Sequence, residues 1–248
     1  MRKKKNLKKL LNLGFLDYTN ITAKCGELDM PYICCKVIPE IDYLASYSQP
    51  STYFHTQNTC VSFFEYDVFF DGLYGLWNGI YHGVSELQQY YLERFQGVKY
   101  FIAPDFSKCG DIPEEENRYR QFKSRIVSIW LAMNLKAVVI PLVSCANNIG
   151  MKYMLDGMED CNIVAFNAKG PLGNVCQLDI FIESIKYTVD RLLNLKSIIV
   201  YSTTPNTEKI RRIFSYALDK GLTLQIPDNM LQTRHRIMGG WRDNGFSV

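Results

Sequence analysis

Two aspartates follow apolar segments that have the composition of buried strands, one directly and the other after a single residue. Asp67 comes after Val61–Tyr66, and Asp105 comes after Val98–Ala103. Paired carboxylates can work as general acid and base, or bind a divalent cation through their oxygens. The alternative is a structural role, in which each carboxylate accepts hydrogen bonds from buried donors. We predict that both aspartates are catalytic, and the same pair is our candidate metal site, with magnesium as the candidate ion.

Arg125 is the third candidate catalytic residue. It stands next to Ile126, at the border of the apolar stripe of a predicted helix over residues 114–134. A guanidinium in that position can bind a carboxylate or a phosphate through two hydrogen bonds. The alternative is a solvated arginine at the edge of the helix.

Further polar residues come after the ends of the apolar segments and are predicted to bind a ligand. They are Glu65, Ser107, Asn167, Lys169, Gly170 and Ser202. The segment from Lys169 to Asn174 precedes a predicted helix, where backbone N–H groups can hold an anion, although a plain loop would have the same composition. There is no G-x-S-x-G motif and there are only three histidines, which argues against a Ser-His-Asp hydrolase and a histidine-based zinc site.

The elements that would position these residues alternate between strands and helices. The apolar segments predict strands, and the amphipathic segments between them predict helices. Such alternation is typical of parallel sheets, in which ligands bind beyond the carboxyl ends of the strands. We predict an α/β fold with a mostly parallel sheet of repeated β/α units, similar to a partial TIM barrel, with an open doubly wound sheet as the alternative. The predicted strands cover residues 61–66, 98–103, 137–143, 163–166, 197–201 and 222–226, and the helices cover 114–134, 175–194 and 206–220.

The N-terminal quarter of the chain lacks this alternation. We predict a basic, irregular extension over residues 1–58, with one strand near residues 32–37, and then a β/α domain over residues 59–248. Six of the 28 basic residues lie in the first nine positions, and the remaining 22 face 25 acidic residues. A body of that charge is unsuited to covering a long stretch of duplex. A contact with nucleic acid would depend on the two basic ends of the chain.

No segment resembles a membrane anchor or a secretory signal. The longest apolar run, Ala137–Val143, has seven residues, whereas a membrane-spanning helix needs about 20. The basic start is followed by a short apolar stretch without a small-residue cleavage site. We therefore expect a cytoplasmic protein without membrane insertion.

Several of these residues also stand in motifs of a known family. The motifs are Phe63-Phe64-x-x-Asp67, Trp77-Asn78, Pro104-Asp105-Phe106-Ser107, Arg125 and Ile140-Pro141. From about Ser62 to the C-terminus the chain resembles the domain-of-unknown-function family 4417, except that Cys145 stands where a tryptophan is expected. The resemblance implies an intracellular protein of phage or mobile-element origin, and it carries no established reaction.

These features are compatible with three functional hypotheses. The first is an enzyme acting on a phosphorylated or nucleotide-type small molecule at the carboxyl face of the β/α fold. The second is a non-catalytic protein of a mobile element that engages a host or replication protein, and the third is a nucleic-acid-binding accessory protein. An enzyme needs a concave pocket that contains the acidic pair, whereas an interaction protein needs an exposed apolar patch.

The eight cysteines are predicted to be reduced thiols. There is no C-x-x-C motif, and the adjacent pair Cys34-Cys35 is poorly suited to binding one metal together. Alkylation of the native protein under non-reducing conditions, and then measurement of the intact mass, should therefore show eight added labels. A stable mass lower by two hydrogens for each pair of cysteines would contradict this prediction.

Overall fold

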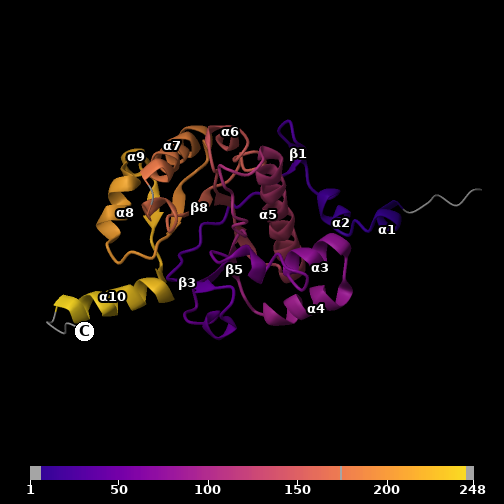
Figure 1. The fold of residues 1–248 in the computed structure, drawn as a ribbon, viewed down its shortest axis with the longest axis horizontal. Coiled ribbons are helices and arrows are strands. Elements are labelled where there is room, and N and C mark those ends of the chain that lie inside the picture. The colour runs from indigo at the N-terminus through magenta and orange to yellow at the C-terminus, as the bar shows by residue number, and fades with distance from the viewer. Residues whose placement is uncertain (1–6, 174, 244–248) are drawn as a thin grey trace, which may run out of the picture.

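The computed structural model describes residues 7–173 and 175–243, and it is a mixed α/β fold built on two parallel sheets (Figure 1). This confirms the predicted α/β class and the parallel pairing of the strands. The five-stranded sheet has the order β11 (Asp228–Asn229), β3 (Tyr43–Ser46), β4 (Thr59–Ser62), β5 (Tyr100–Ile102), β6 (Val138–Ile140). The four-stranded sheet has the order β10 (Thr223–Gln225), β9 (Ser197–Tyr201), β8 (Ile163–Asn167), β7 (Leu142–Val143).

The chain passes from one sheet to the other at Pro141, which separates β6 from β7. The carbonyl of Ile140 accepts from Ala103 N at 2.9 Å in the five-stranded sheet, and that of Pro141 accepts from Ala165 N at 2.8 Å in the four-stranded sheet. Proline has no N–H to leave unpaired at this division. The predicted strand over 137–143 is therefore one extended segment shared between two sheets.

A second passage joins β10 to β11 through Ile226 and Pro227. The side chain of Gln225 accepts from Ile41 N at 3.0 Å and donates to the carbonyl of Pro39 at 3.0 Å, just before β3. Asp228 N donates to the carbonyl of Asp42 at 3.1 Å. The two sheets are thus connected at both of their edges.

The helices lie on the outside of the strands. In Figure 1, α3 (Leu76–His82), α4 (Ser85–Arg94) and α5 (Glu114–Leu135) lie on one side, and α7 (Val175–Arg191), α8 (Thr207–Ile213) and α9 (Ser215–Asp219) lie on the other. The shorter α6 (Asn148–Met151) precedes β8, and α10 (Met230–Asp243) comes after β11. The helix predicted over 206–220 is divided at Phe214, whose ring is completely buried. No helix of the described ranges is long and apolar enough to cross a membrane.

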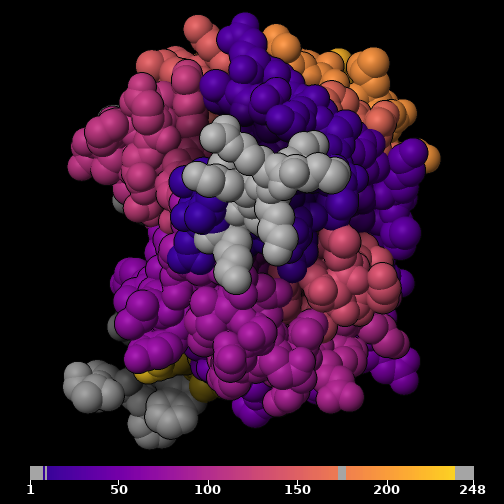
Figure 2. Space-filling model, turned by 90° about the vertical axis from the view of Figure 1, so that its right-hand side faces the viewer, coloured from indigo at the N-terminus to yellow at the C-terminus, as the bar shows by residue number. Residues whose placement is uncertain are grey.

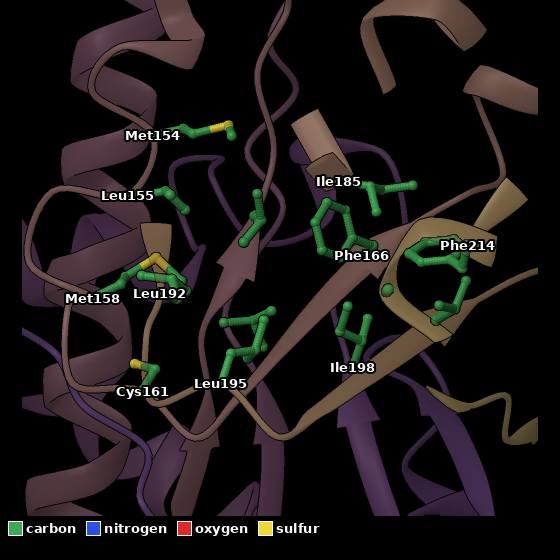
Figure 3. Packing of buried hydrophobic residues seen from close by; sticks show 14 of the residues in the cluster. Met154, Leu155, Met158, Cys161, Phe166, Ile185, Leu192, Leu195, Ile198 and Phe214 are labelled. Atoms are coloured by element: carbon green, nitrogen blue, oxygen red, sulfur yellow. The ribbon is translucent and has the colours of Figure 1, made fainter. Parts of the chain in front are cut away.

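The apolar side chains form three clusters, and the alternation of strand side chains decides which cluster each one joins. Ile198 on β9 faces α7 and α9, where Phe166, Ile185 and Phe214 pack (Figure 3). A second, aromatic cluster lies beneath α3, α4 and α5 and includes Phe63 and Trp130. The third cluster contains residues from both sheets, among them Leu44, Cys60, Ile102, Ile140, Ile163 and Ile199. The two sheets therefore share one buried core.

The N-terminal segment differs from the predicted extension. β3 lies inside the five-stranded sheet, between β11 and β4, so the sheet begins at Tyr43 and not at residue 59. Only Met30–Pro31 (β2), paired with Lys24–Cys25 (β1), forms a strand near the one predicted over 32–37. The N-terminal segment before β3, which also contains α1 (Leu7–Leu11) and α2 (Leu16–Thr19), lies over one face of the molecule (Figure 2, indigo). It is held by backbone hydrogen bonds, such as that from Ile33 N to Gly157 O at 2.8 Å.

Gly157 provides a test of how strongly this segment is attached. Its φ is +79°, and a Cβ there would lie 2.8 Å from the carbonyl oxygen of Pro31. Gly157→Ala should therefore lower the free energy of unfolding through both backbone strain and a clash, by about 2–4 kcal/mol. Gly221→Ala is the matched control, because Gly221 has a φ of +82° with nothing within 4 Å of the added carbon. Equal shifts of the two urea midpoints would show that the contact with Pro31 is unimportant.

Candidate functional site

A cavity of about 610 Å³ opens at the carboxyl ends of strands from both sheets. Its polar lining comes from the residues at and just after the ends of β3, β4, β5, β8 and β11, and aromatic rings form much of the rest. The lining residues include Ser46, Ser62, Phe64, Glu65, Tyr66, Phe69, Asp105, Ser107, Asn167, Lys169, Gly170, Tyr201 and Asn229. Six of the nine predicted site residues are among them: Glu65, Asp105, Ser107, Asn167, Lys169 and Gly170.

Asp105 lies at the centre of this arrangement. Its Oδ2 accepts from Asn167 Nδ2 at 2.8 Å, and Asn167 Oδ1 in turn accepts from Lys169 N at 3.0 Å. Desolvation raises the pKa of the Asp105 carboxyl, and the charge of Asp67 adds to this, while Lys108 and Asn167 oppose it. A second cavity of about 550 Å³ shares Asp105, Ser107, Asn167 and Gly170 with the first. The carboxyl group of Asp105 therefore stands in a wall common to two cavities.

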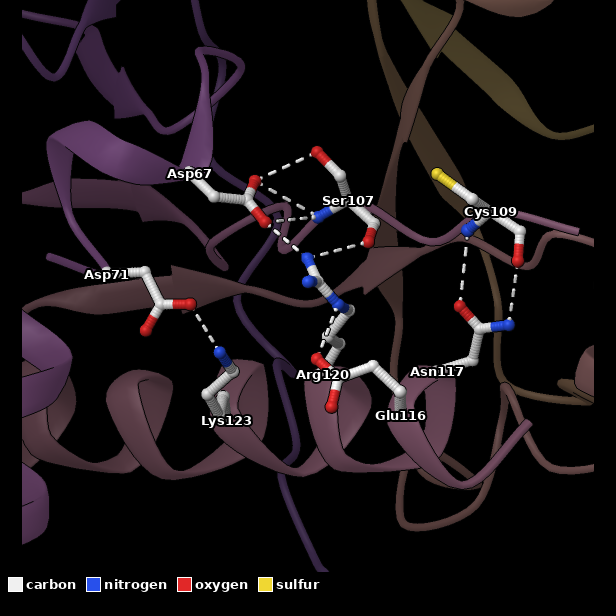
Figure 4. A network of polar contacts seen from close by, with 8 residues as sticks. All are labelled: Asp67, Asp71, Ser107, Cys109, Glu116, Asn117, Arg120 and Lys123. Carbon is white, nitrogen blue, oxygen red and sulfur yellow. Dashed lines mark hydrogen bonds and ion pairs between the residues drawn. The ribbon is translucent and has the colours of Figure 1, made fainter. Parts of the chain in front are cut away.

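Asp67 comes after the neighbouring strand β4 but is engaged by other groups (Figure 4). Its carboxylate accepts from Ser107 N at 3.1 Å and Ser107 Oγ at 2.8 Å, and from Arg120 Nη1 at 2.6 Å. Arg120 also donates to Glu116 Oε1 at 2.9 Å. Both oxygens of Asp67 thus already accept hydrogen bonds. Among the described residues there is no group of three histidine, cysteine or acidic side chains that could hold a metal ion.

One face of α5 holds the loop that carries Asp105. We call residues 103–113, between β5 and α5, the β5–α5 loop. Ser124 Oγ donates to Pro104 O at 2.7 Å, Arg120 Nη1 donates to Ser107 O at 3.0 Å, and Asn117 exchanges two hydrogen bonds with the backbone of Cys109. These three residues of α5 are spaced by three and four positions, so they lie on the same face of the helix. The loop is therefore held at intervals along its length.

Arg125 lies away from both cavities. Its Nη2 donates to the carbonyls of Met154 at 3.1 Å and Asp156 at 3.3 Å. The side chain is buried, and desolvation lowers its pKa to about 10. These contacts give Arg125 a structural role in holding the segment after α6, in place of the anion-binding role that we predicted. Arg120, which the sequence analysis missed, is the arginine that binds one of the two predicted aspartates, Asp67.

The remaining predicted residues divide between the cavity and the scaffold. Glu65 lines the first cavity and accepts from Ser48 N at 2.7 Å and from the Ser48 hydroxyl. Ser202 is buried and lines neither cavity, and its hydroxyl accepts from Thr204 N at 3.2 Å within a turn. Lys169 is exposed at the rim of the first cavity.

Lys108 is a second site residue that sequence reasoning missed. It lines the second cavity, and its Nζ donates to Ser144 Oγ at 2.6 Å. Desolvation lowers the pKa of its amine to about 8, against the opposing effect of Asp105. The sequence did offer one indication, its position three residues after Asp105. A charged residue so close to the end of a strand lies near the carboxyl face of the sheet, where Asp105 also lies.

In the described part of the basic C-terminal end, two residues contact neighbouring polar groups. Arg236 Nη2 is paired with Asp228 at 2.6 Å, and His235 Nδ1 lies 2.7 Å from the carbonyl of Thr203. Arg2, Lys3, Lys4 and Lys5 lie outside the described residues.

Comparison with known proteins agrees with the motifs around this site. Searches of curated proteins and of solved structures gave no match. A family model described as a domain of unknown function, DUF4417, matches residues 26–217. The match begins earlier than the motifs from Ser62 onward indicated, and it includes β3, Asp67, Asp105, Lys108, Asn167 and Lys169. Because the match covers most of the 248 residues, the chain belongs to the DUF4417 family.

Proposed function

We propose that this protein is an enzyme whose active site comprises the two cavities at the carboxyl ends of the strands. In this proposal Asp105 moves a proton to or from a small phosphorylated or nucleotide-type substrate. The observation that carries the proposal is the position of Asp105, a half-buried carboxyl with a raised pKa in the wall common to both cavities. A carboxyl that protonates closer to neutral pH is better suited to general acid–base catalysis.

The lining of the first cavity supports this substrate class. Phe64 and Tyr201 are stacked with ring centroids 4.6 Å apart, and Tyr66 and Phe69 present exposed rings at the rim. Planar bases bind to such aromatic surfaces by stacking. Lys169 at the same rim offers a positive charge to a phosphate, and the glycine beside it allows close approach to the backbone.

We further propose that the two sheets together form one seven-stranded, TIM-like barrel. The support comes from the two shared segments, β6 with β7 and β10 with β11, and from the core that both sheets share. The contacts Asp105–Asn167 and Phe64–Tyr201 each join a residue just beyond a strand of the five-stranded sheet to one of the four-stranded sheet. In such a barrel, both cavities would lie at the face where the active sites of known barrel enzymes occur.

The most direct experiment is a mass-spectrometric screen for small molecules that co-purify with the native protein. A phosphorylated or nucleotide-type compound should be retained by the wild type and lost from Asp105→Asn or Lys169→Ala. Lys99→Ala is the control, because Lys99 is exposed and lines a different cavity. Retention of the same compound by all variants would place its binding site elsewhere.

Thermal stability separates the site role of Asp105 from the structural role of Asp67. Between its unfolded and its raised folded pKa, Asp105 binds more protons in the folded state, so its contribution to stability falls as pH rises through that window. Asp105→Asn keeps an oxygen that can accept from Asn167, and it removes the loss of stability that ionisation of Asp105 causes. The variant should therefore be as stable as the wild type or more stable near neutral pH. In Asp67→Asn an amide replaces the carboxylate that accepts hydrogen bonds from Ser107 and Arg120. The free energy of unfolding of this variant should fall by about 1–3 kcal/mol.

The measurement is calorimetry of both variants and the wild type at pH 5 and pH 7.5. The advantage of Asp105→Asn over the wild type should be larger at pH 7.5. A large loss of stability in Asp105→Asn at both pH values would mean that the carboxylate is a structural acceptor, and it would remove the main support for the proposed active site.

A protein-binding role is the second candidate function, and one observation favours it. The segment after β4 exposes five large apolar side chains over nine residues: Tyr66 81%, Val68 72%, Phe69 50%, Leu73 72% and Tyr74 77%. Exposed apolar groups concentrated in this way are typical of interaction surfaces. Under this hypothesis no small molecule co-purifies, and a protein partner of the wild type is lost from Leu73→Ser and retained by Asp105→Asn.

A further inference from the structure

We propose that Lys108 is a nucleophilic amine that forms an imine with an aldehyde or ketone substrate in the second cavity. This inference rests on the proposed function, because it assigns the carbonyl chemistry of a substrate bound beside Asp105. It adds a covalent step and a substrate class that acid–base catalysis alone does not require.

The position of Lys108 is set by the residues on both sides of it. Ser107 is held by Asp67 and Arg120, and Cys109 is held through two hydrogen bonds to the buried side chain of Asn117 (Figure 4). Lys108 therefore extends from a fixed backbone into the cavity that Val143, Ser144 and Cys145 also line. A fixed nucleophile meets its substrate in a defined geometry.

The amine has the partners that an imine-forming lysine needs. Its Nζ donates to the Ser144 hydroxyl at 2.6 Å, and among the side chains that the structure describes no carboxylate lies within the 4.0 Å of an ion pair. Lys123 on α5 is by contrast paired with Asp71. The charges that act on Lys108 are those of Asp105 and Asp67, which raise its pKa, and that of Arg125, which lowers it. The neighbouring Cys145 is a neutral thiol near neutral pH, because burial raises its pKa to about 11. Burial with weak compensation leaves a larger share of neutral amine, which is the reactive form.

Asp105 supplies the proton that the reaction consumes. The nitrogen lone pair attacks the carbonyl carbon, and the carbonyl oxygen takes a proton from the carboxylic acid of Asp105. The nitrogen of the resulting carbinolamine returns its extra proton to the Asp105 carboxylate. Asp105 then protonates the hydroxyl group, which leaves as water and gives a protonated imine. One amine, one carbonyl group and one proton thus give one iminium ion and one water molecule, with no change in oxidation state.

The experiment uses glycolaldehyde phosphate as the probe and cyanoborohydride to reduce any imine to a stable amine. The rate of labelling is measured by peptide mapping, with the exposed Lys99 and Lys152 as internal references. At pH 7.5 an amine with a pKa of about 8 has on the order of 100-fold more neutral form than one with the ordinary value near 10.4. Lys108 should therefore be labelled tens of times faster than the references at this pH.

A variant of Asp105 distinguishes a failure of the imine proposal from a failure of the proposed enzyme function. Asp105→Asn should slow labelling of Lys108 at least tenfold while the references are unchanged, whereas a merely accessible lysine would not respond to this substitution. Labelling of Lys108 no faster than the references would overturn the imine proposal, and the proposed function would stand if Asp105→Asn still lost its co-purifying compound. Fast labelling of Lys108 that is unaffected by Asp105→Asn would contradict the role given to Asp105 in this step.

Discussion

The hydrogen bond between Asn167 and Asp105 joins the ends of β8 and β5, two strands that belong to different sheets. Between them runs the segment that Pro141 divides, so neither sheet alone brings these two side chains together. The bond also determines which groups lie on each side of it. Phe64, Tyr201 and Lys169 line the cavity on one side, and Lys108 and Ser144 line the cavity on the other. Any ligand that spans both cavities must pass this pair.

The helix α5 connects this site to the core. Its apolar side buries Ile126, Ile129 and Trp130 between the clusters, which fixes the rotation of the helix about its axis. That rotation in turn directs Asn117, Arg120 and Ser124 toward the β5–α5 loop. Three acidic residues lie in its first turn, at the positive end of the helix dipole, where their negative charge stabilises the helix. Hydrophobic packing of α5 therefore determines where its polar residues meet the β5–α5 loop. A substitution that opens a cavity in this packing would shift the loop as well.

The strands and the residues directly after them could be predicted, because short apolar runs indicate the strands and the next few residues must lie at the strand ends. Asp105 and Asn167 were found in this way. β3 could not be predicted, since its four residues have no clear alternation and become a strand only between β4 and β11. Arg120 was missed because it lies about 140° from Arg125 around the helix, and the sequence does not say which side of the stripe faces the loop. The position of Lys108 in the second cavity depends on the contacts between the β5–α5 loop and α5, and no local sequence pattern predicts those contacts.

The pairing of β11 with β3 bears on how the chain is made. Residues 43 and 44 pair on one edge with residues 228 and 229, which come 185 positions later in a chain of 248 residues. During synthesis on the ribosome that edge of β3 has no partner until the last strand emerges, while β4, β5 and β6 can already assemble on its other side. An unpaired edge is a site where chains associate with one another, and such distant contacts slow folding. The nascent protein thus has a long interval in which a chaperone that covers β3 would raise its yield.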